Sequence, residues 1–277
     1  MSLGKRINFL GRVVTLFLSV LILANCASAP ENDPEALSEF KKLNDPVEPF
    51  NRTIFGFNQG LDKAVIKPVT GAYRAIAPEP VRRSVHNVLD NLRTPQVFIN
   101  DVLQGELRRA GVTLARFVIN TTIGILGIWD QAADMGLEQH SEDFGQTLAV
   151  WSVPEGPYVM LPIFGPSNPR DAFGKVVDFF FDPLNLWAAN TDRDWIPVTR
   201  TLVSGIDTRD QLWDVLEDLE KSSIDFYAAI RSLYRQRRKD EINNGQGADD
   251  KPAPGFSGDF EIAEPEDETK GGSRKIK

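Results

Sequence analysis

Apolar residues in the middle of the chain recur every three or four positions, the spacing that places them on one face of an α-helix. One such face comprises Leu103, Leu107, Ala110, Leu114, Phe117 and Val118, and the opposite face carries Arg108, Arg109, Thr113 and Arg116. A second stretch runs from Leu212 to Tyr234, with an expected break at Ser222 and Ser223. These stretches predict a mainly α-helical fold.

Prolines limit the length of the expected helices, because proline lacks the amide hydrogen that an interior helical position donates. The segment between Leu61 and Val97 is expected to be cut into short helices by Pro68, Pro78, Pro80 and Pro95. The strongest strand candidate is Thr147 to Val153, paired with Tyr158 to Ile163 across a Pro-Glu-Gly turn. The prediction is a helical body with one small β-hairpin.

The first 25 residues have the pattern of a secretory signal. Lys5, Arg6 and Arg12 give this end a charge of +3. The apolar run from Val13 to Ala24 would span about 18 Å as a helix, against about 30 Å for the hydrocarbon core of a bilayer. Because the run is short for a membrane-spanning helix, we predict a signal peptide over residues 1–25.

The only cysteine of the chain, Cys26, stands at the end of this run, in Leu-Ala-Asn-Cys. The sequence resembles the bacterial lipobox, in which the cysteine is acylated and becomes the first residue of the mature protein. Asn25 departs from it, since the lipobox usually has Gly, Ala or Ser there. Acyl chains contribute about 0.8 kcal/mol per buried CH₂, so such a cysteine would be a stable anchor. The alternative is a cysteine in a signal that is cleaved elsewhere.

The rest of the chain divides into three parts. Residues 26–43 are polar and acid-rich and predict a tether, and residues 44–238 are denser in apolar residues and predict the folded domain. Residues 239–277 contain six basic and ten acidic residues and almost no apolar periodicity. That composition predicts a disordered acidic tail.

Composition excludes several classes of function. The chain has 31 Lys and Arg against 39 Asp and Glu, a formal net charge of -8, which argues against a nucleic-acid partner. One cysteine excludes an intrachain disulfide, and one cysteine with two histidines disfavours a structural zinc site. We therefore predict no metal and no cofactor.

No catalytic residue is nominated by the sequence. It contains no G-x-S-x-G elbow, P-loop, G-x-G-x-x-G or H-E-x-x-H motif. His86 is expected to be solvated or to cap a helix, and His140 to lie in a surface loop. The basic residues from Arg231 to Lys239 either complement the dipole at a helix C-terminus or bind lipid phosphates.

The chain has 17 Phe but only 4 Tyr, and Phe favours dry protein cores or lipid because it has no polar group. Two clusters stand out, one at Phe50, Phe55 and Phe57 and the other in the run from Val176 to Trp187. Either the protein core or acyl chains could surround them, and the sequence leaves both open.

Ordered motifs across residues 44–238 identify the body as similar to the MlaA/VacJ family of outer-membrane lipoproteins. It opens with Asn-Asp-Pro-Val-Glu-Pro-Phe-Asn-Arg at 44–52. The most specific stretch is Glu-Asp-Phe-Gly-Gln-Thr-Leu at 142–148, followed by Gly-Pro-Tyr at 156–158 and Arg-Asp at 170–171. The resemblance covers about 70% of the chain.

The resemblance implies a fold and a role. Family members are ring-shaped assemblies of short and amphipathic helices, embedded in the outer membrane of Gram-negative bacteria, anchored by lipid and facing the periplasm. They associate with trimeric porins and remove phospholipids from the outer leaflet. A periplasmic carrier passes these lipids to an ABC transporter. The implied role is retrograde phospholipid transport that maintains lipid asymmetry, without enzymatic activity.

The resemblance also directs attention to candidate residues. Polar groups among phenylalanines would suit a head group passing beside acyl chains, and this set comprises Phe50, Asn51, Arg52, Phe55, Phe57 and Asn58. Channel-side candidates near the expected hairpin are Gly156, Pro157 and Tyr158, and the lipidation candidate is Cys26. Two other functions stay open: a structural lipoprotein that stabilises porins, and a lipid hydrolase.

Overall fold

The computed structural model describes residues 45–244. The predicted signal peptide, Cys26, the tether at 26–43 and the tail beyond Asn244 lie outside the described residues. The last described helix ends at Ile242 rather than at the expected domain boundary, Arg238.

The described elements are helices and one pair of strands. In chain order they are α3 (Glu48–Leu61), the π-helical turn η1 (Asp62–Ile66), α4 (Lys67–Ile76), α5 (Glu79–Gln104), α6 (Leu107–Thr122), α7 (Gln131–Asp134), α8 (Phe144–Val150), β1 (Val159–Leu161), β2 (Gly165–Ser167), α9 (Pro169–Phe181), α10 (Pro183–Asn190), α11 (Trp195–Gln211), α12 (Trp213–Ser222) and α13 (Phe226–Ile242). A mainly α fold with one small hairpin is confirmed.

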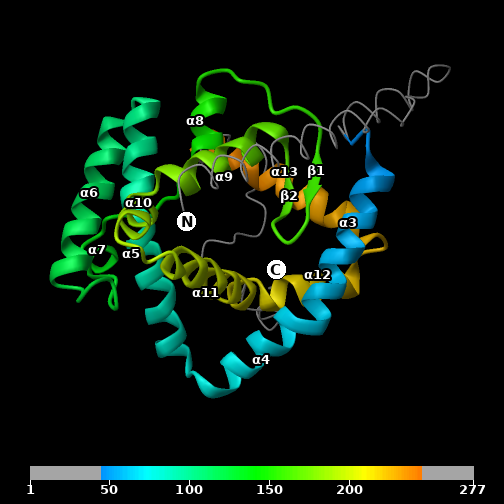
Figure 1. The fold of residues 1–277 in the computed structure, drawn as a ribbon, viewed down its shortest axis with the longest axis horizontal. Helices are drawn as coiled ribbons and strands as arrows, with labels where there is room; N and C mark the ends of the chain where they lie inside the picture. Colours follow the sequence, from blue (N-terminus) through cyan, green and yellow to red (C-terminus); the bar gives the residue numbers. More distant parts are fainter. Residues whose placement is uncertain (1–44, 245–277) are drawn as a thin grey trace, which may run out of the picture.

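The helices close a ring. Helix α9 contacts α10, α10 contacts α11, α11 contacts α12, α12 contacts α13, and α13 contacts α8, which packs on α9. Figure 1 shows α9 and α11 on opposite sides of this circuit, with α10 joining them at one end and α3 near the other. The short helices follow from the sequence, since Pro169 and Pro183 each begin a new helix.

The expected breaks at Ser222 and Pro78 are confirmed, and the one at Pro95 is wrong. Helix α12 ends at Ser222, and Pro78 directly precedes α5. Pro68 and Pro80 stand in the first turns of α4 and α5. Pro95, however, lies inside α5, which continues to Gln104. Because α5 packs against α6, α8, α10 and α11, these contacts hold the helix together despite the lost hydrogen bond. Gly105, with φ of 81°, then separates α5 from α6.

The predicted strand from Thr147 to Val153 is wrong, because Phe144–Val150 forms helix α8. The Asp143 side chain caps this helix by accepting a hydrogen bond from the Gln146 amide at 2.9 Å. The hairpin lies later in the chain, where β1 pairs antiparallel with β2 and Met160 faces Pro166. The prediction of a strand rested on the β-branched and apolar residues between Thr147 and Val153. The helix forms instead because Asp143 caps its first turn.

Helix α3 holds the hairpin through two asparagines. The fully buried Asn51 amide donates to the Tyr158 carbonyl at 3.0 Å and accepts from the Met160 amide at 2.9 Å. Two turns further along, Asn58 donates to the Leu161 carbonyl at 2.9 Å and accepts from the Ile163 amide at 2.7 Å. The two asparagines therefore complete the hydrogen bonding of β1 as a neighbouring strand would.

We predict that Asn51→Ala lowers the free energy of unfolding by about 3 kcal/mol, because it leaves buried partners on β1 unpaired. Thr53→Ala on the same helix is the control and should change it by about 0.5 kcal/mol or less. The measurement is denaturant unfolding of the purified protein in detergent. Equal unfolding midpoints for the two variants would contradict this role of Asn51.

Candidate functional site

Helix α6 is inverted relative to a helix of a water-soluble protein. Its buried residues include Thr113, Arg116 and Asn120, whereas Leu107 and Val118 are 72% and 51% exposed. In a water-soluble protein the apolar stripe of such a helix faces the core. The large apolar residues of the predicted stripe, Leu107, Leu114 and Val118, therefore point outward, although Ala110 is buried.

The same inversion extends over much of the ring. Large apolar side chains are exposed along α9, α10 and α11 and in the loop after α6: Phe173, Val176, Phe179, Phe180, Phe181, Leu186, Trp187, Trp195, Val198, Leu202, Ile123, Ile125, Leu126 and Trp129. Exposed apolar surface on this scale is typical of a face that contacts a membrane or another protein. Over residues 45–244, no helix combines the length and apolar character needed to cross a membrane.

Most of the buried side chains in the described part of the chain are charged or polar, because the large apolar side chains point outward. Arg116 of α6 pairs with Asp130 at 2.8 Å and also donates to the Leu137 carbonyl, and Asn120 donates to Asp130 at 2.8 Å. On the other side of the ring, the buried Arg231 pairs with Asp45 at 2.7 Å. Such groups are stable in an interior only when they are paired.

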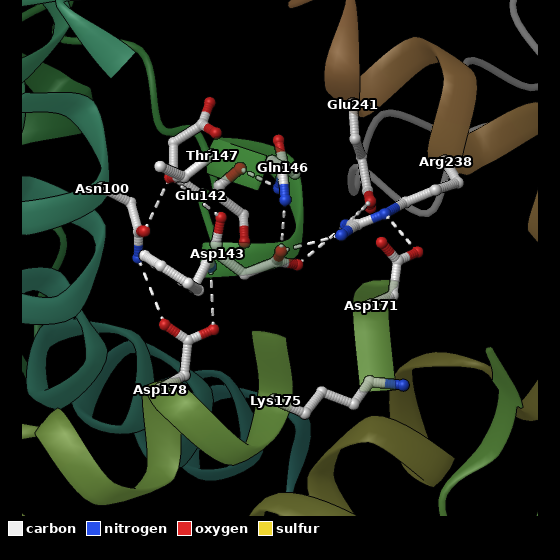
Figure 2. Close-up of polar contacts among 12 residues, drawn as sticks. Asn100, Glu142, Asp143, Gln146, Thr147, Asp171, Lys175, Asp178, Arg238 and Glu241 are labelled. Atoms are coloured by element: carbon white, nitrogen blue, oxygen red, sulfur yellow. Dashed lines mark hydrogen bonds and ion pairs between the residues drawn. The ribbon is translucent and has the colours of Figure 1, made fainter. Parts of the chain in front are cut away.

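The largest of these polar clusters joins α8, α9 and α13 (Figure 2). Arg238 donates to both oxygens of Asp143, at 2.7 and 2.8 Å, and lies 2.8 Å from Asp171. Burial alone would raise the pKa of Asp143, but the bonds and charge of Arg238 lower it to about 2. Of the basic run at 231–239, Arg231 and Arg238 thus serve as buried ion pairs.

Gly145 and Gly174 allow α8 and α9 to approach each other closely at this cluster. A Cβ atom on Gly174 of α9 would overlap the backbone of Gly145 in α8. The sequence stretch 142–148 thus supplies both the cap of α8 and the close approach that brings Asp143 to Arg238.

Asp178 differs from the other carboxylates of this cluster because, in the part of the chain that the structure describes, it forms no ion pair. It accepts from the Phe144 amide at 3.0 Å and from the Asn100 amide at 3.3 Å. Burial raises the pKa of Asp178 to about 6, against the opposing effect of the Phe144 hydrogen bond.

The polar lipid-path candidates all hold the protein together. Asn51 and Asn58 bind the hairpin, and Arg52 bonds to Glu48 at 2.7 Å and to Asp225 at 2.5 Å. The guanidinium of Arg52 also lies 4.4 Å from the centre of the Tyr227 ring.

The aromatic lipid-path candidates fall into two groups. Phe55 packs edge-on against Phe226 and Tyr227, so it belongs to the core. Phe50 and Phe57 are 45% and 55% exposed and could meet acyl chains. Packing in the protein core is thus shown for Phe55, whereas acyl-chain contact at Phe50 and Phe57 stays a prediction.

The three channel-side candidates precede β1. Tyr158 is buried and packs with Met160 and Tyr227 in the aromatic core. Gly156 has φ of 72°, and a side chain there would meet the ring of Pro169. Pro157 lies between them and is half-buried. These residues shape the approach to the hairpin, and a role in a channel stays a prediction.

Both histidines bond to carboxylates within the described part of the chain. His86 bonds to Asp207 at 2.8 Å and to Asp90 at 3.1 Å, and these bonds raise its pKa to about 10. His140 lies in the loop between α7 and α8, as predicted, but its side chain is only 15% exposed and its Nε2 bonds to Asp101 at 3.0 Å and to Thr113 at 3.1 Å. Between Asp45 and Asn244, no group of His, Cys, Asp and Glu could hold a metal ion.

Two apolar hollows lie on the ring. One, of about 210 Å³, is lined by Thr94, Pro95, Phe98, Ile99, Leu114 and Phe117 between α5 and α6. The other, of about 190 Å³, is lined by Phe179, Pro197, Val198, Thr201 and Leu202 between α9 and α11. The sequence predicted neither, because each combines residues from two helices.

We predict a specific pH dependence from Asp178. Its folded pKa of about 6 exceeds the unfolded value of 3.8, so the folded state binds the extra proton and stability falls as pH rises between these values. The loss is on the order of 2 kcal/mol, because one pKa unit is about 1.4 kcal/mol and the side chain is partly solvated.

Asp178→Asn should flatten the slope of unfolding free energy against pH between about pH 4 and pH 6. Asp134→Asn, on an exposed residue of α7, is the control and should keep the wild-type slope. Asp143 does not affect this slope. Because its pKa is lowered to about 2, its contribution to the pH dependence of stability lies below about pH 4. Identical slopes for wild type and Asp178→Asn would contradict the prediction.

Comparison with known proteins is consistent with this architecture. The family model described as MlaA lipoprotein matches residues 43–241. The chain is 35% identical over 240 residues to the intermembrane phospholipid transport system lipoprotein MlaA of Escherichia coli, covering 85% of this chain and 90% of that one. It is 31% identical over 244 residues to MlaA of Haemophilus influenzae, covering 86% and 93%.

A solved structure, described as the structural basis for maintenance of bacterial outer membrane lipid asymmetry, has the same fold. It superposes with a TM-score of 0.64 at 35% identity, covering 72% of this chain and 99% of that chain. Family model, relatives and structure agree, and the chain belongs to the MlaA lipoprotein family.

Proposed function

We propose that this chain is an outer-membrane lipoprotein that removes phospholipids from the outer leaflet and passes them towards the periplasm. The observation that carries the proposal is the inverted ring, with apolar side chains outside and paired charges inside. An outward apolar face suits acyl chains of the surrounding bilayer. Relatives named as phospholipid transport lipoproteins support the same role.

Transport of this kind needs no bond chemistry. A phospholipid that crosses a bilayer unaided must bring its charged head group through hydrocarbon, where an unpaired charge is very costly. A protein path with polar groups lowers that barrier, and later steps supply direction because a passive path only equilibrates populations. The absence of an enzymatic activity is therefore part of the proposal.

The partners in this proposal are a trimeric porin beside the ring and a soluble carrier that delivers lipid to an ABC transporter. We place acyl-chain contact at Phe50 and Phe57, which are exposed on α3. Asn51, Arg52 and Asn58 would lie beside that path while holding the hairpin. Acylation at Cys26 would anchor the ring at the membrane from the periplasmic side.

The test in cells measures surface-exposed phospholipid in a strain that lacks the gene. We expect a rise that wild type reverses and Cys26→Ala does not, because the unacylated protein would leave the membrane. Full rescue by Cys26→Ala would show that the anchor is dispensable. No rise, in a strain without a redundant pathway, would contradict transport and favour a structural role in stabilising porins.

The lipid path is tested in the same strain with Phe57→Arg, which places a charge at an exposed position of α3. Transport should fall while the protein level stays unchanged, and Phe57→Leu, which keeps an apolar side chain at this position, is the matched control. Release of lysophospholipid by the purified wild-type protein would instead indicate a lipid hydrolase.

A further inference from the structure

Lys175 of α9 is a cation that no carboxylate of the described residues pairs with. Within residues 45–244 its ammonium forms no ion pair, and its one hydrogen bond goes to the Ser167 hydroxyl at 3.4 Å. Figure 2 shows its side chain extending away from Asp178. The side chain is exposed, yet burial of the ammonium lowers its pKa. Lys175 thus reaches solvent from a recessed position.

The nearby carboxylates do not need Lys175 as a partner. Asp143 is bound by Arg238 through both oxygens. Asp171 is bound by Arg170 at 3.0 Å and by the Tyr234 hydroxyl at 2.6 Å, and Arg238 also lies beside it. The charge of Lys175 is therefore available to a ligand.

An apolar groove begins one helical turn further along the same helix. Lys175 and Phe179 are four residues apart, so they share one face of α9. Their Cα atoms are separated by about 6 Å along the helix axis. Phe179 lines the hollow of about 190 Å³ between α9 and α11, with Pro197, Val198, Thr201 and Leu202. This hollow is open to the surface and lined by apolar side chains, so a segment of an acyl chain can lie along it.

We infer that Lys175 and this groove form a phospholipid-binding site, in which the ammonium binds the phosphate and the groove holds an acyl chain. The inference rests on the proposed transport function and names a contact within it. A cation beside an apolar groove matches the two chemically different parts of a phospholipid. A charge-assisted hydrogen bond to phosphate supplies the polar half of the recognition.

The experiment measures binding of two probes to the full-length protein purified in detergent. The probes are radiolabelled dioleoylphosphatidylglycerol and dioleoylglycerol, which share their acyl chains but differ in the phosphate. We expect Lys175→Gln to weaken binding of dioleoylphosphatidylglycerol about tenfold and to leave dioleoylglycerol binding unchanged. Lys175→Arg should retain wild-type binding, because it keeps the charge.

Two further variants separate the site from nonspecific effects. Val198→Trp fills the groove and should weaken binding of both probes. Lys221→Gln removes a cation from the surface of α12, where it pairs with Glu217 at 3.5 Å, and should change neither.

Equal binding of dioleoylphosphatidylglycerol by wild type and Lys175→Gln would overturn the inference, as would wild type binding neither probe. Oleate displacing dioleoylphosphatidylglycerol at equal concentration would assign the site to free fatty acids and also overturn it. If wild type restores lipid asymmetry in cells while Lys175→Gln binds normally, only this site is wrong. If binding depends on Lys175 but asymmetry is not restored, the proposed function is wrong and the site stands.

Discussion

Buried ion pairs and amide hydrogen bonds are the constraint on which this fold depends. Because the apolar faces of α6 and of α9 to α11 point outward, they cannot supply the core. Apart from the small aromatic core around Tyr227, the interior is held by ion pairs: Arg116 with Asp130, Arg231 with Asp45 and Arg238 with Asp143. Removing one partner of a buried pair typically costs about 3–5 kcal/mol, because it leaves the other charge unpaired. These pairs also connect segments far apart in the chain, so they determine how the ring closes.

The same arrangement links fold to function. Because α9 and α10 are short and each begins at a proline, the chain can change direction between them and follow the ring. The ring has apolar side chains on its outside and polar side chains within it. A phospholipid has that same division into apolar and polar parts. The proposed transport needs only that both parts find matching surfaces along one path, which Lys175 and the groove at Phe179 would provide together.

The sequence predicted the helical class, the break at Ser222 and the family, because periodicity and ordered motifs are local signals. It misplaced the strand at Thr147 to Val153, since a short β-favouring run did not reveal the cap at Asp143. The predicted break at Pro95 was wrong because the packing of α5 against its neighbouring helices outweighs the one hydrogen bond that proline removes. The outward direction of the apolar stripe from Leu107 could not be predicted, because periodicity locates a face without saying what covers it. The four-residue spacing of Lys175 and Phe179 indicates that they share a helical face. The groove itself could not be predicted, because its other lining residues lie on α11, a distant segment of the chain.

The central claim, that the apolar outside of the ring contacts lipid, is tested most directly by tryptophan quenching. Full-length variants that keep only Trp195 or only Trp213 would be reconstituted into vesicles whose acyl chains carry bromine. Trp195 is 64% exposed, whereas the Trp213 ring is covered by Arg74 and Arg209. We predict strong quenching of Trp195 by the brominated chains and little quenching of Trp213. Quenching of Trp195 by aqueous acrylamide but not by brominated lipid would contradict the claim.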